Sequence, residues 1–298
     1  MADDQYTFQD PVTRFERIAP PEQRQSEPGL DRDLQPQADH GENSYRGSGR
    51  LTGRRALITG GDSGIGAAIA IAFAREGADV AISYLPQEEP DAQRIVALIE
   101  DAGRKALALP GDLKDADYCR SLVERTVEEF GGLDLLVNNG GKQVSQDSIT
   151  DITDEQFDHT LKTNVYAMFW ITRAAVPHMP PGSTIINTTS IQAYQPSPTL
   201  IDYATTKAAI NNFTKGLAQQ LAPKGIRVNA IAPGPIWTPL QPSYGQPMEK
   251  LTHFGQSTPL GRAGQPAELA PAYVFLASAE SSYVVGETLA VTGGEPTP

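Results

Sequence analysis

Short apolar runs alternate with longer amphipathic stretches from residue 51 to the end of the chain. The short runs are apolar throughout, which is typical of strands that are buried on both faces of a sheet. They predict seven strands, at 55–59, 80–84, 106–109, 133–137, 183–187, 226–231 and 288–291. The longer stretches predict helices at 65–75, 91–102, 116–130, 154–176, 203–221 and 267–278.

This alternation predicts an α/β fold of the Rossmann type, a doubly wound seven-stranded parallel sheet in a single domain. Right-handed crossovers place helices on both faces of such a sheet. Ligands bind at the carboxyl ends of its strands. The residues that follow each predicted strand are therefore the candidates for a functional site.

Residues 1–50 differ in composition from the rest of the chain: they are polar and rich in proline, and their apolar positions follow neither a helical nor a strand periodicity. Such a segment cannot bury a core of its own. Scattered apolar side chains, among them Phe15, Leu34 and Tyr45, leave two alternatives open: the segment is disordered, or it lies on a folded surface. We expect an extension at 1–50 and a catalytic domain at 51–298, with a lid at about 239–264.

Composition removes several classes of function. The 298 residues carry a formal net charge of −12, which opposes binding to nucleic acid or to an anionic membrane surface. No run approaches the roughly 20 apolar residues of a membrane span, and the first residues do not resemble a signal peptide, so a cytoplasmic protein is expected. Cys119 is the only cysteine, and no Cys/His cluster indicates a metal site.

A glycine-rich loop, T-G-G-D-S-G-I-G at 59–66, joins the first predicted strand to the first predicted helix. Gly60 permits a sharp turn, Gly64 lets the backbone approach a pyrophosphate, and Gly66 lets the helix pack against the strand. The helix N-terminus then offers N–H groups and a positive dipole to a phosphate. The loop predicts dinucleotide binding, with Asp62, Ser63 and Ile65 beside the glycines.

This motif resembles the cofactor loop of short-chain dehydrogenases/reductases. The variant at 59–66 resembles a subgroup of bacterial oxidoreductases and plant glucose/ribitol dehydrogenase homologues. That subgroup also has a Pro-rich N-terminal segment that ends much like D-H-G-E-N-S-Y at 39–45. The resemblance covers nearly the whole chain, and it implies an NAD(P)-dependent oxidoreductase that acts on a carbonyl/alcohol substrate.

Tyr203 and Lys207 form a Y-x-x-x-K pattern on a predicted helix, where positions i and i+4 share a face. An ammonium near a phenol favours the phenolate and lowers the pKa of the tyrosine toward neutral pH. Ser190 lies 13 residues before Tyr203, which matches the family's spacing. The resemblance implies that Tyr203 is the general acid/base, that Ser190 binds the substrate oxygen, and that Asn164 holds a water linked to Lys207.

Further cofactor contacts follow from the same resemblance. They come after the second, third, fourth and sixth predicted strands: Tyr84, Asp112, Leu113, Asn139, Gly140, Gly141, Pro233, Gly234, Ile236 and Thr238. No arginine or lysine stands where a 2′-phosphate is usually bound. Because Asp62 would repel that phosphate, the sequence favours NAD over NADP.

The sequence says less about the substrate pocket than about the cofactor site. Gln192 follows Ser190 and is expected to line the substrate pocket with Ser190 and Tyr203. The candidates are sugars, polyols, aldehydes and ketones. The resemblance also implies a homotetramer in which the helices near 154–176 and 203–221 pair across an interface.

Three other classes of protein remain open at this point. A redox sensor would keep the dinucleotide site without turnover, and a stress-related interaction protein would use residues 1–45 to recruit a partner. A sugar epimerase or dehydratase would share the fold, but it needs a larger C-terminal substrate domain than this chain has room for.

Overall fold

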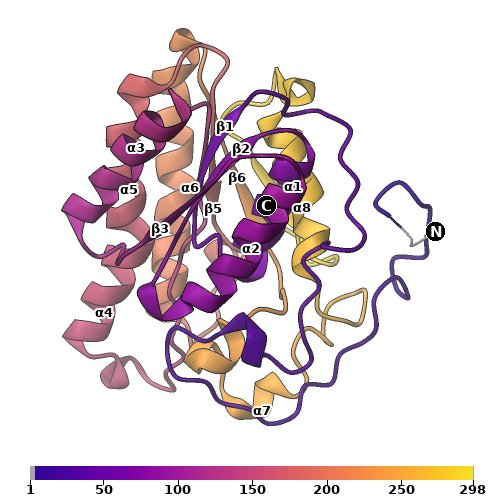
Figure 1. Cartoon of the computed structure of the whole chain (residues 1–298). Coiled ribbons are helices and arrows are strands. Elements are labelled where there is room, and N and C mark those ends of the chain that lie inside the picture. The colour runs from indigo at the N-terminus through magenta and orange to yellow at the C-terminus, as the bar shows by residue number, and fades with distance from the viewer. Residues whose placement is uncertain (1–3, 298) are drawn as a thin grey trace.

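The computed structural model describes residues 4–297, and its centre is a seven-stranded parallel sheet (Figure 1). The strand order is β3-β2-β1-β4-β5-β6-β7, and every neighbouring pair is parallel. The predicted Rossmann-type fold is confirmed. The strands are β1 (Arg55–Thr59), β2 (Asp79–Tyr84), β3 (Ala106–Pro110), β4 (Leu135–Asn138), β5 (Thr184–Thr188), β6 (Arg227–Pro233) and β7 (Thr288–Val291).

Helices cover both faces of the sheet, and each layer has its own apolar cluster. One layer holds α1 (Gly64–Arg75), α2 (Glu89–Asp101) and α8 (Pro266–Ala277). The other holds α3 (Ala116–Phe130), α5 (Ala167–Ala175) and α6 (Ile201–Leu221). Strand side chains such as Leu57 and Ile58 are fully buried between the layers, which explains their uniform apolar character.

Local sequence explains where the elements begin and end. The carboxylate of Asp115 caps α3 by accepting hydrogen bonds from the backbone N–H groups of Asp117 (2.8 Å) and Tyr118 (3.3 Å). Gly131 ends that helix in the left-handed region, at φ 76°. Apart from the helix expected at 154–176, the predicted boundaries agree with the structure to within two residues.

The helix expected at 154–176 is not a single α-helix. It consists of α4 (Asp154–Leu161), a π-helical turn (Lys162–Tyr166) and α5. Such turns insert one residue into the helical ladder and are frequent at functional sites. Here the turn contains Asn164, whose side chain bonds to the backbone of Lys142 instead of facing solvent.

The N-terminal extension lies on the folded domain, along the α1/α8 side and beneath the sheet edge in Figure 1. Leu34 is fully buried in a small cluster with Trp237 and Phe254, and the Trp237 indole N–H donates to the carbonyl of Pro36 (2.8 Å). The Tyr45 hydroxyl donates to Glu76 (2.7 Å). Of the two alternatives that the sequence left open, the structure shows the surface-bound one; the domain boundary at residue 50 stays a prediction.

The segment expected to be a lid, at about 239–264, contains an irregular turn (Gln241–Gly245) and the short helix α7 (Met248–Leu251). It lies next to the extension at the same edge of the sheet (Figure 1). Tyr244 has a φ of 67°, which is unusual for a residue other than glycine. Whether the segment moves as a lid stays a prediction.

Candidate active site

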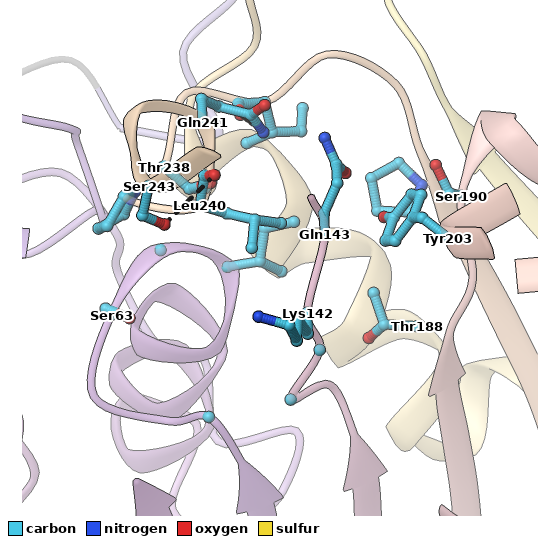
Figure 2. Close-up of a pocket in the computed structure, with 18 of the residues that line it drawn as sticks. Ser63, Lys142, Gln143, Thr188, Ser190, Tyr203, Thr238, Leu240, Gln241 and Ser243 are labelled. Carbon is cyan, nitrogen blue, oxygen red and sulfur yellow. Dashed lines mark hydrogen bonds between the residues drawn. The ribbon is translucent and has the colours of Figure 1, made fainter. Parts of the chain in front are cut away.

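A cavity of about 860 Å³ opens at the carboxyl ends of β1, β2, β4, β5 and β6, which is the edge expected to bind ligands. Figure 2 shows Ser190 and Tyr203 on one side of this cavity and Ser63 of the glycine loop on the other. All the expected cofactor residues line it except Gly66, and so do Ser190, Gln192, Tyr203 and Lys207. Gly66 and Asn164 lie behind its wall.

The glycine loop has the geometry that its sequence predicts. Gly60 and Gly64 have positive φ angles of 61° and 48°. A Cβ on Gly66 would lie 1.7 Å from the carbonyl oxygen of Gly60, so this position admits glycine alone. Its role is therefore packing of α1 against the loop, while Gly60 and Gly64 face the cavity.

The cavity suits a nicotinamide dinucleotide in two respects. Ser63, at the N-cap of α1, forms no side-chain capping bond, so the first N–H groups of that helix are left for a phosphate. A Cβ on Gly64 would lie 2.9 Å from Thr238 Cγ2, and one on Gly140 would lie 2.7 Å from Leu113 Cδ1. Side chains at these positions would narrow the groove, so glycines keep it open.

Carboxyl groups gather at the end of the groove next to β2. Asp62 is buried, and one of its carboxylate oxygens has no hydrogen-bond partner among residues 4–297. The pKa of Asp62 is raised to about 7, mainly by burial and to a smaller extent by the negative charges of Asp91 and Asp31. Burial raises the pKa of Glu88 to about 8, with Asp62 adding to the effect. This end of the site is therefore less negative at neutral pH than its sequence implies.

Asn139 connects the end of β4 to the end of β1 by hydrogen bonds. Its side-chain amide donates to the carbonyl oxygens of Thr59 (3.1 Å) and Gly60 (3.2 Å). The backbone N–H groups of Asn139 and Gly140 both donate to the Thr59 hydroxyl (2.9 Å each). The N-N-G-G segment thus holds the glycine loop in place and also forms part of the cavity wall.

Tyr203, Lys207 and Ser190 meet in the cavity. Tyr203 and Lys207 lie one turn apart on α6, and the Lys207 ammonium is 5.3 Å from the centre of the Tyr203 ring. That ammonium donates to the carbonyl oxygen of Thr188, at the end of β5 (2.9 Å). Ser190 lies two residues beyond β5 rather than at its last residue, and its hydroxyl accepts from the N–H of Gln192 (3.1 Å).

The expected lowering of the Tyr203 pKa is not found in this structure. Burial raises the pKa of Tyr203 to about 12, and a hydrogen bond with Ser190 offsets part of that rise. Burial also lowers the pKa of Lys207 to about 8. The loss of water around Tyr203 and Lys207 has a larger effect on both pKa values than the charge of the neighbouring group, which is why the expectation from the sequence was wrong.

Asn164 acts on the backbone in this structure. Its carbonyl oxygen accepts from the N–H of Lys142 (2.7 Å), and its amide donates to the carbonyl of Lys142 (2.9 Å) and to the Thr206 hydroxyl (2.9 Å). It also lines a second cavity of about 10 Å³ with Gly140 and Thr188, close to the size of one water molecule. The π-helical turn gives the side chain this position.

Sequence reasoning missed several residues of the cavity wall. Lys142 and Gln143 directly follow N-N-G-G, and their position after β4 was the available signal. His159 also lines the cavity, although its spacing from the other histidines gave no reason to select it. Nothing in the sequence pointed to Glu27, which reaches the cavity from the extension.

None of the helices in residues 4–297 has the length and apolar character needed to cross a bilayer. Within the same residues, the His, Cys, Asp and Glu side chains form no group of three or more that is suited to hold a metal ion.

The fold and the cavity together define a dinucleotide-binding oxidoreductase with a Tyr/Lys/Ser site. The family model described as enoyl-(acyl carrier protein) reductase matches residues 60–295, and solved short-chain dehydrogenases have the same fold. The chain belongs to the short-chain dehydrogenase/reductase family, as its motifs suggested. It is an oxidoreductase that acts on CH–OH/C=O groups with a nicotinamide dinucleotide.

Named relatives span nearly the whole chain. An uncharacterized oxidoreductase of Escherichia coli, YghA, is 58% identical over 97% of this chain and 98% of its own. The glucose and ribitol dehydrogenase of Daucus carota is 44% identical, over 92% of this chain and 96% of its own. The chloroplastic NADPH-dependent aldehyde reductase 1 of Arabidopsis thaliana is 44% identical, with the same coverage.

A solved short-chain dehydrogenase from Burkholderia cenocepacia, in complex with NADP, is 39% identical to this chain. It has a TM-score of 0.76 and covers 82% of this chain and 98% of its own. The preference for NAD that the sequence suggested is not supported by these comparisons, because the Burkholderia cenocepacia protein binds NADP and the Arabidopsis thaliana enzyme is named for NADPH.

Proposed function

We propose that this protein reduces a small aldehyde or aldose with NADPH, or oxidises the corresponding alcohol with NADP, at the site formed by Tyr203, Lys207 and Ser190. The observation that carries the proposal is the convergence of these three side chains in the cavity beside the glycine loop. When bound, the nicotinamide supplies the hydride chemistry, while the protein provides position and electrostatics.

In this proposal Tyr203 is the general acid in reduction and the general base in oxidation. Ser190 donates a hydrogen bond to the substrate oxygen and stabilises the charge that develops on it. Lys207 binds the nicotinamide ribose and provides the positive charge that favours the phenolate of Tyr203. Water that enters with a ligand, or the ligand's own dipoles, would reduce the burial penalty that now holds the Tyr203 pKa high.

Asn164 is proposed as a positioning residue for proton relay. It fixes the backbone of Lys142, and the water-sized cavity beside it also touches Gly140 and Thr188. The Lys207 ammonium donates to the carbonyl of Thr188. A water in the small cavity would therefore lie between Asn164 and Thr188, the residue to which Lys207 is bonded.

NADP is proposed over NAD on two grounds. The relative from Arabidopsis thaliana and the solved relative from Burkholderia cenocepacia carry NADPH and NADP in their names. In addition, Asp62 and Glu88 have raised pKa values of about 7 and 8, so these carboxyls are largely protonated at the lower end of the neutral range. A protonated carboxyl can donate a hydrogen bond to a 2′-phosphate instead of repelling it.

The substrate class is proposed from the polar side chains near Ser190. Figure 2 shows Gln143 between Tyr203 and the segment that carries Thr238 and Gln241, and Gln192 and Gln241 also line the cavity. Amide groups suit the hydroxyls of a sugar or a hydroxyaldehyde. The names of the relatives from Daucus carota and Arabidopsis thaliana point to the same class.

The proposal is tested by titrating the protein with NAD, NADH, NADP and NADPH and then assaying aldehydes, aldoses, polyols and ketones at 340 nm. Tyr203→Phe should keep its affinity for the dinucleotide but lose at least about a hundredfold in turnover, as expected when a general acid/base is removed. Near-normal turnover in this variant would refute the role of Tyr203. Dinucleotide binding without turnover on any substrate would favour a redox sensor.

The assembly and location expected from the sequence also remain proposals. We propose a homotetramer in which α4, α5 and α6 pair with another subunit. Exposed large apolar side chains on those helices and their π-helical junction support this: Phe157, Tyr166, Phe169 and Ile201. A cytoplasmic location is proposed on sequence grounds alone.

A further inference from the structure

A lysine inside the cavity is paired with a carboxylate from the N-terminal extension. The Lys142 ammonium forms an ion pair with Glu27, and the Lys142 side chain is only 13% exposed. Its backbone is held on both sides by Asn164, so its position is fixed. Among residues 4–297 no other carboxylate lies within ion-pair distance of this ammonium. A cation with so little contact with water needs a counter-charge, and here the extension provides it.

The lysine lies on the route between the two halves of the site. In Figure 2 its side chain occupies the middle of the cavity, between Ser63 of the glycine loop and Thr188 next to the Tyr/Lys/Ser group. Burial lowers the pKa of His159, which lines the same cavity, and the charges of Lys142 and Lys114 lower it further. An anion that crosses the cavity would meet this ammonium.

Glu27 reaches the lysine from a turn that also contacts the lid. The N–H of Gln25 donates to the carbonyl of Pro242 (3.2 Å), and the Ser243 hydroxyl donates to the carbonyl of Pro28 (3.3 Å). Gly29 has a φ of 80°, and a Cβ there would lie 2.9 Å from the carbonyl oxygen of Pro239. The backbone that carries Glu27 is therefore held beside Lys142 by a turn that is packed against residues 239–243, while the Glu27 side chain itself is 41% exposed.

We propose that Lys142 is an anion-binding residue of this site and that Glu27 is its built-in counter-ion, which a phosphate-type anion displaces. Two sources can supply that anion: the diphosphate of the dinucleotide, in which case the inference rests on the proposed function, or an anionic group on the substrate. In both cases entry of the anion frees the carboxylate of Glu27, which belongs to the turn packed against residues 239–243. Ligand binding is thereby linked to the N-terminal extension.

The experiment compares Glu27→Gln, Lys142→Gln and the double variant in the full-length protein. Glu22→Gln is the matched control, because it removes one charge from an exposed position of the same segment. The probes are NADPH, inorganic pyrophosphate, and an aldose with and without a phosphate ester. Calorimetry gives the affinity of the first two, and steady-state kinetics gives KM for the others.

Glu27→Gln should tighten anion binding five- to tenfold, because the competing carboxylate is gone, and Lys142→Gln should weaken it at least tenfold. In the double variant the effect of Glu27→Gln should disappear. Changes in NADPH affinity identify the diphosphate as the anion, whereas changes in KM confined to the phosphorylated aldose identify the substrate. Pyrophosphate binding is measurable even if no substrate turns over. A failure of the proposed function can therefore be told apart from a failure of this inference.

The inference is overturned if Glu27→Gln weakens anion binding. It is also overturned if both single variants match Glu22→Gln for all probes while thermal unfolding shows that they are folded.

Discussion

Burial has a stronger effect than neighbouring charge on the ionisable residues of this site. Lys207 and Tyr203 are both enclosed, so the pKa of the lysine falls to about 8 and that of the tyrosine rises to about 12. Asp62 and Glu88 shift upward for the same reason. Four groups of the site thus change their charge at pH values far from those of free side chains, and pH becomes a direct probe of their roles.

The first prediction concerns Lys207. With the dinucleotide well below saturation, kcat/KM for NADPH in aldehyde reduction should fall above a pH of about 8, because the free enzyme then loses the ammonium that supports Tyr203. The decrease should approach tenfold per pH unit. Lys207→Arg keeps a positive charge to far higher pH, so its residual activity should show the fall at a more alkaline pH. An identical pH profile in this variant would exclude Lys207 as the titrating group.

The second prediction concerns Asp62. Between pH 6.5 and 9, Asp62 and Glu88 lose their protons, and the affinity for NADPH should fall on the order of tenfold relative to NADH through charge repulsion. Asp62→Asn should remove much of this dependence and leave NADH binding nearly unchanged with pH. The ratio of the two dissociation constants, measured by calorimetry, checks this; a pH-independent ratio in the wild-type protein would contradict it.

At the scale of elements, the junctions between strands and helices set the geometry of the site. The loop after β1 depends on contacts too close for any side chain, and the N-N-G-G segment after β4 holds that loop by hydrogen bonds. The π-helical turn between α4 and α5 brings Asn164 to the same junction. Small changes at these positions should therefore affect the whole site.

Gly66→Ala tests this view. The new Cβ would lie 1.7 Å from the carbonyl of Gly60, so the loop must move. We expect a loss of about 3 kcal/mol in the free energy of unfolding, at the upper end for overpacking, together with loss of dinucleotide binding. Gly216→Ala is the control: it lies in α6 with open space around it, and it should be neutral or stabilise by up to about 1 kcal/mol. Equal behaviour of the two variants in chemical denaturation would refute the argument.

The sequence predicted the elements better than their connections. Alternating apolar runs were sufficient for seven parallel strands, because burial on both faces leaves a clear pattern. The π-helical turn was not predictable, since the helical pattern continues through Lys162–Tyr166. Glu27 was out of reach for a different reason: its partner Lys142 is 115 residues away, and the intervening sequence contains no sign of their contact.

At the scale of the whole molecule, apolar surface remains exposed on α4, α5 and α6. Phe169 is 42% exposed with Tyr166 close by in the sequence, and the Arg173 guanidinium lies 5.0 Å from the Phe169 ring centre. Phe169→Glu should reduce the mass of the assembly, because it places a charge in the proposed interface. Phe8→Glu, at a fully exposed position of the extension, should not. Light scattering after size-exclusion chromatography distinguishes them, and a wild-type monomer would rule out the tetramer.

The contact between Pro36 and Trp237 has a consequence for how the protein is made. The two residues are 201 positions apart, so the ribosome releases the first long before the second exists. At about 5–20 residues per second, the N-terminal segment waits roughly 10–40 s for its partners. During that interval Leu34 is exposed to other chains in the cell. Nascent-chain chaperones that shield apolar segments would therefore be expected to act on the beginning of this protein more than on its centre.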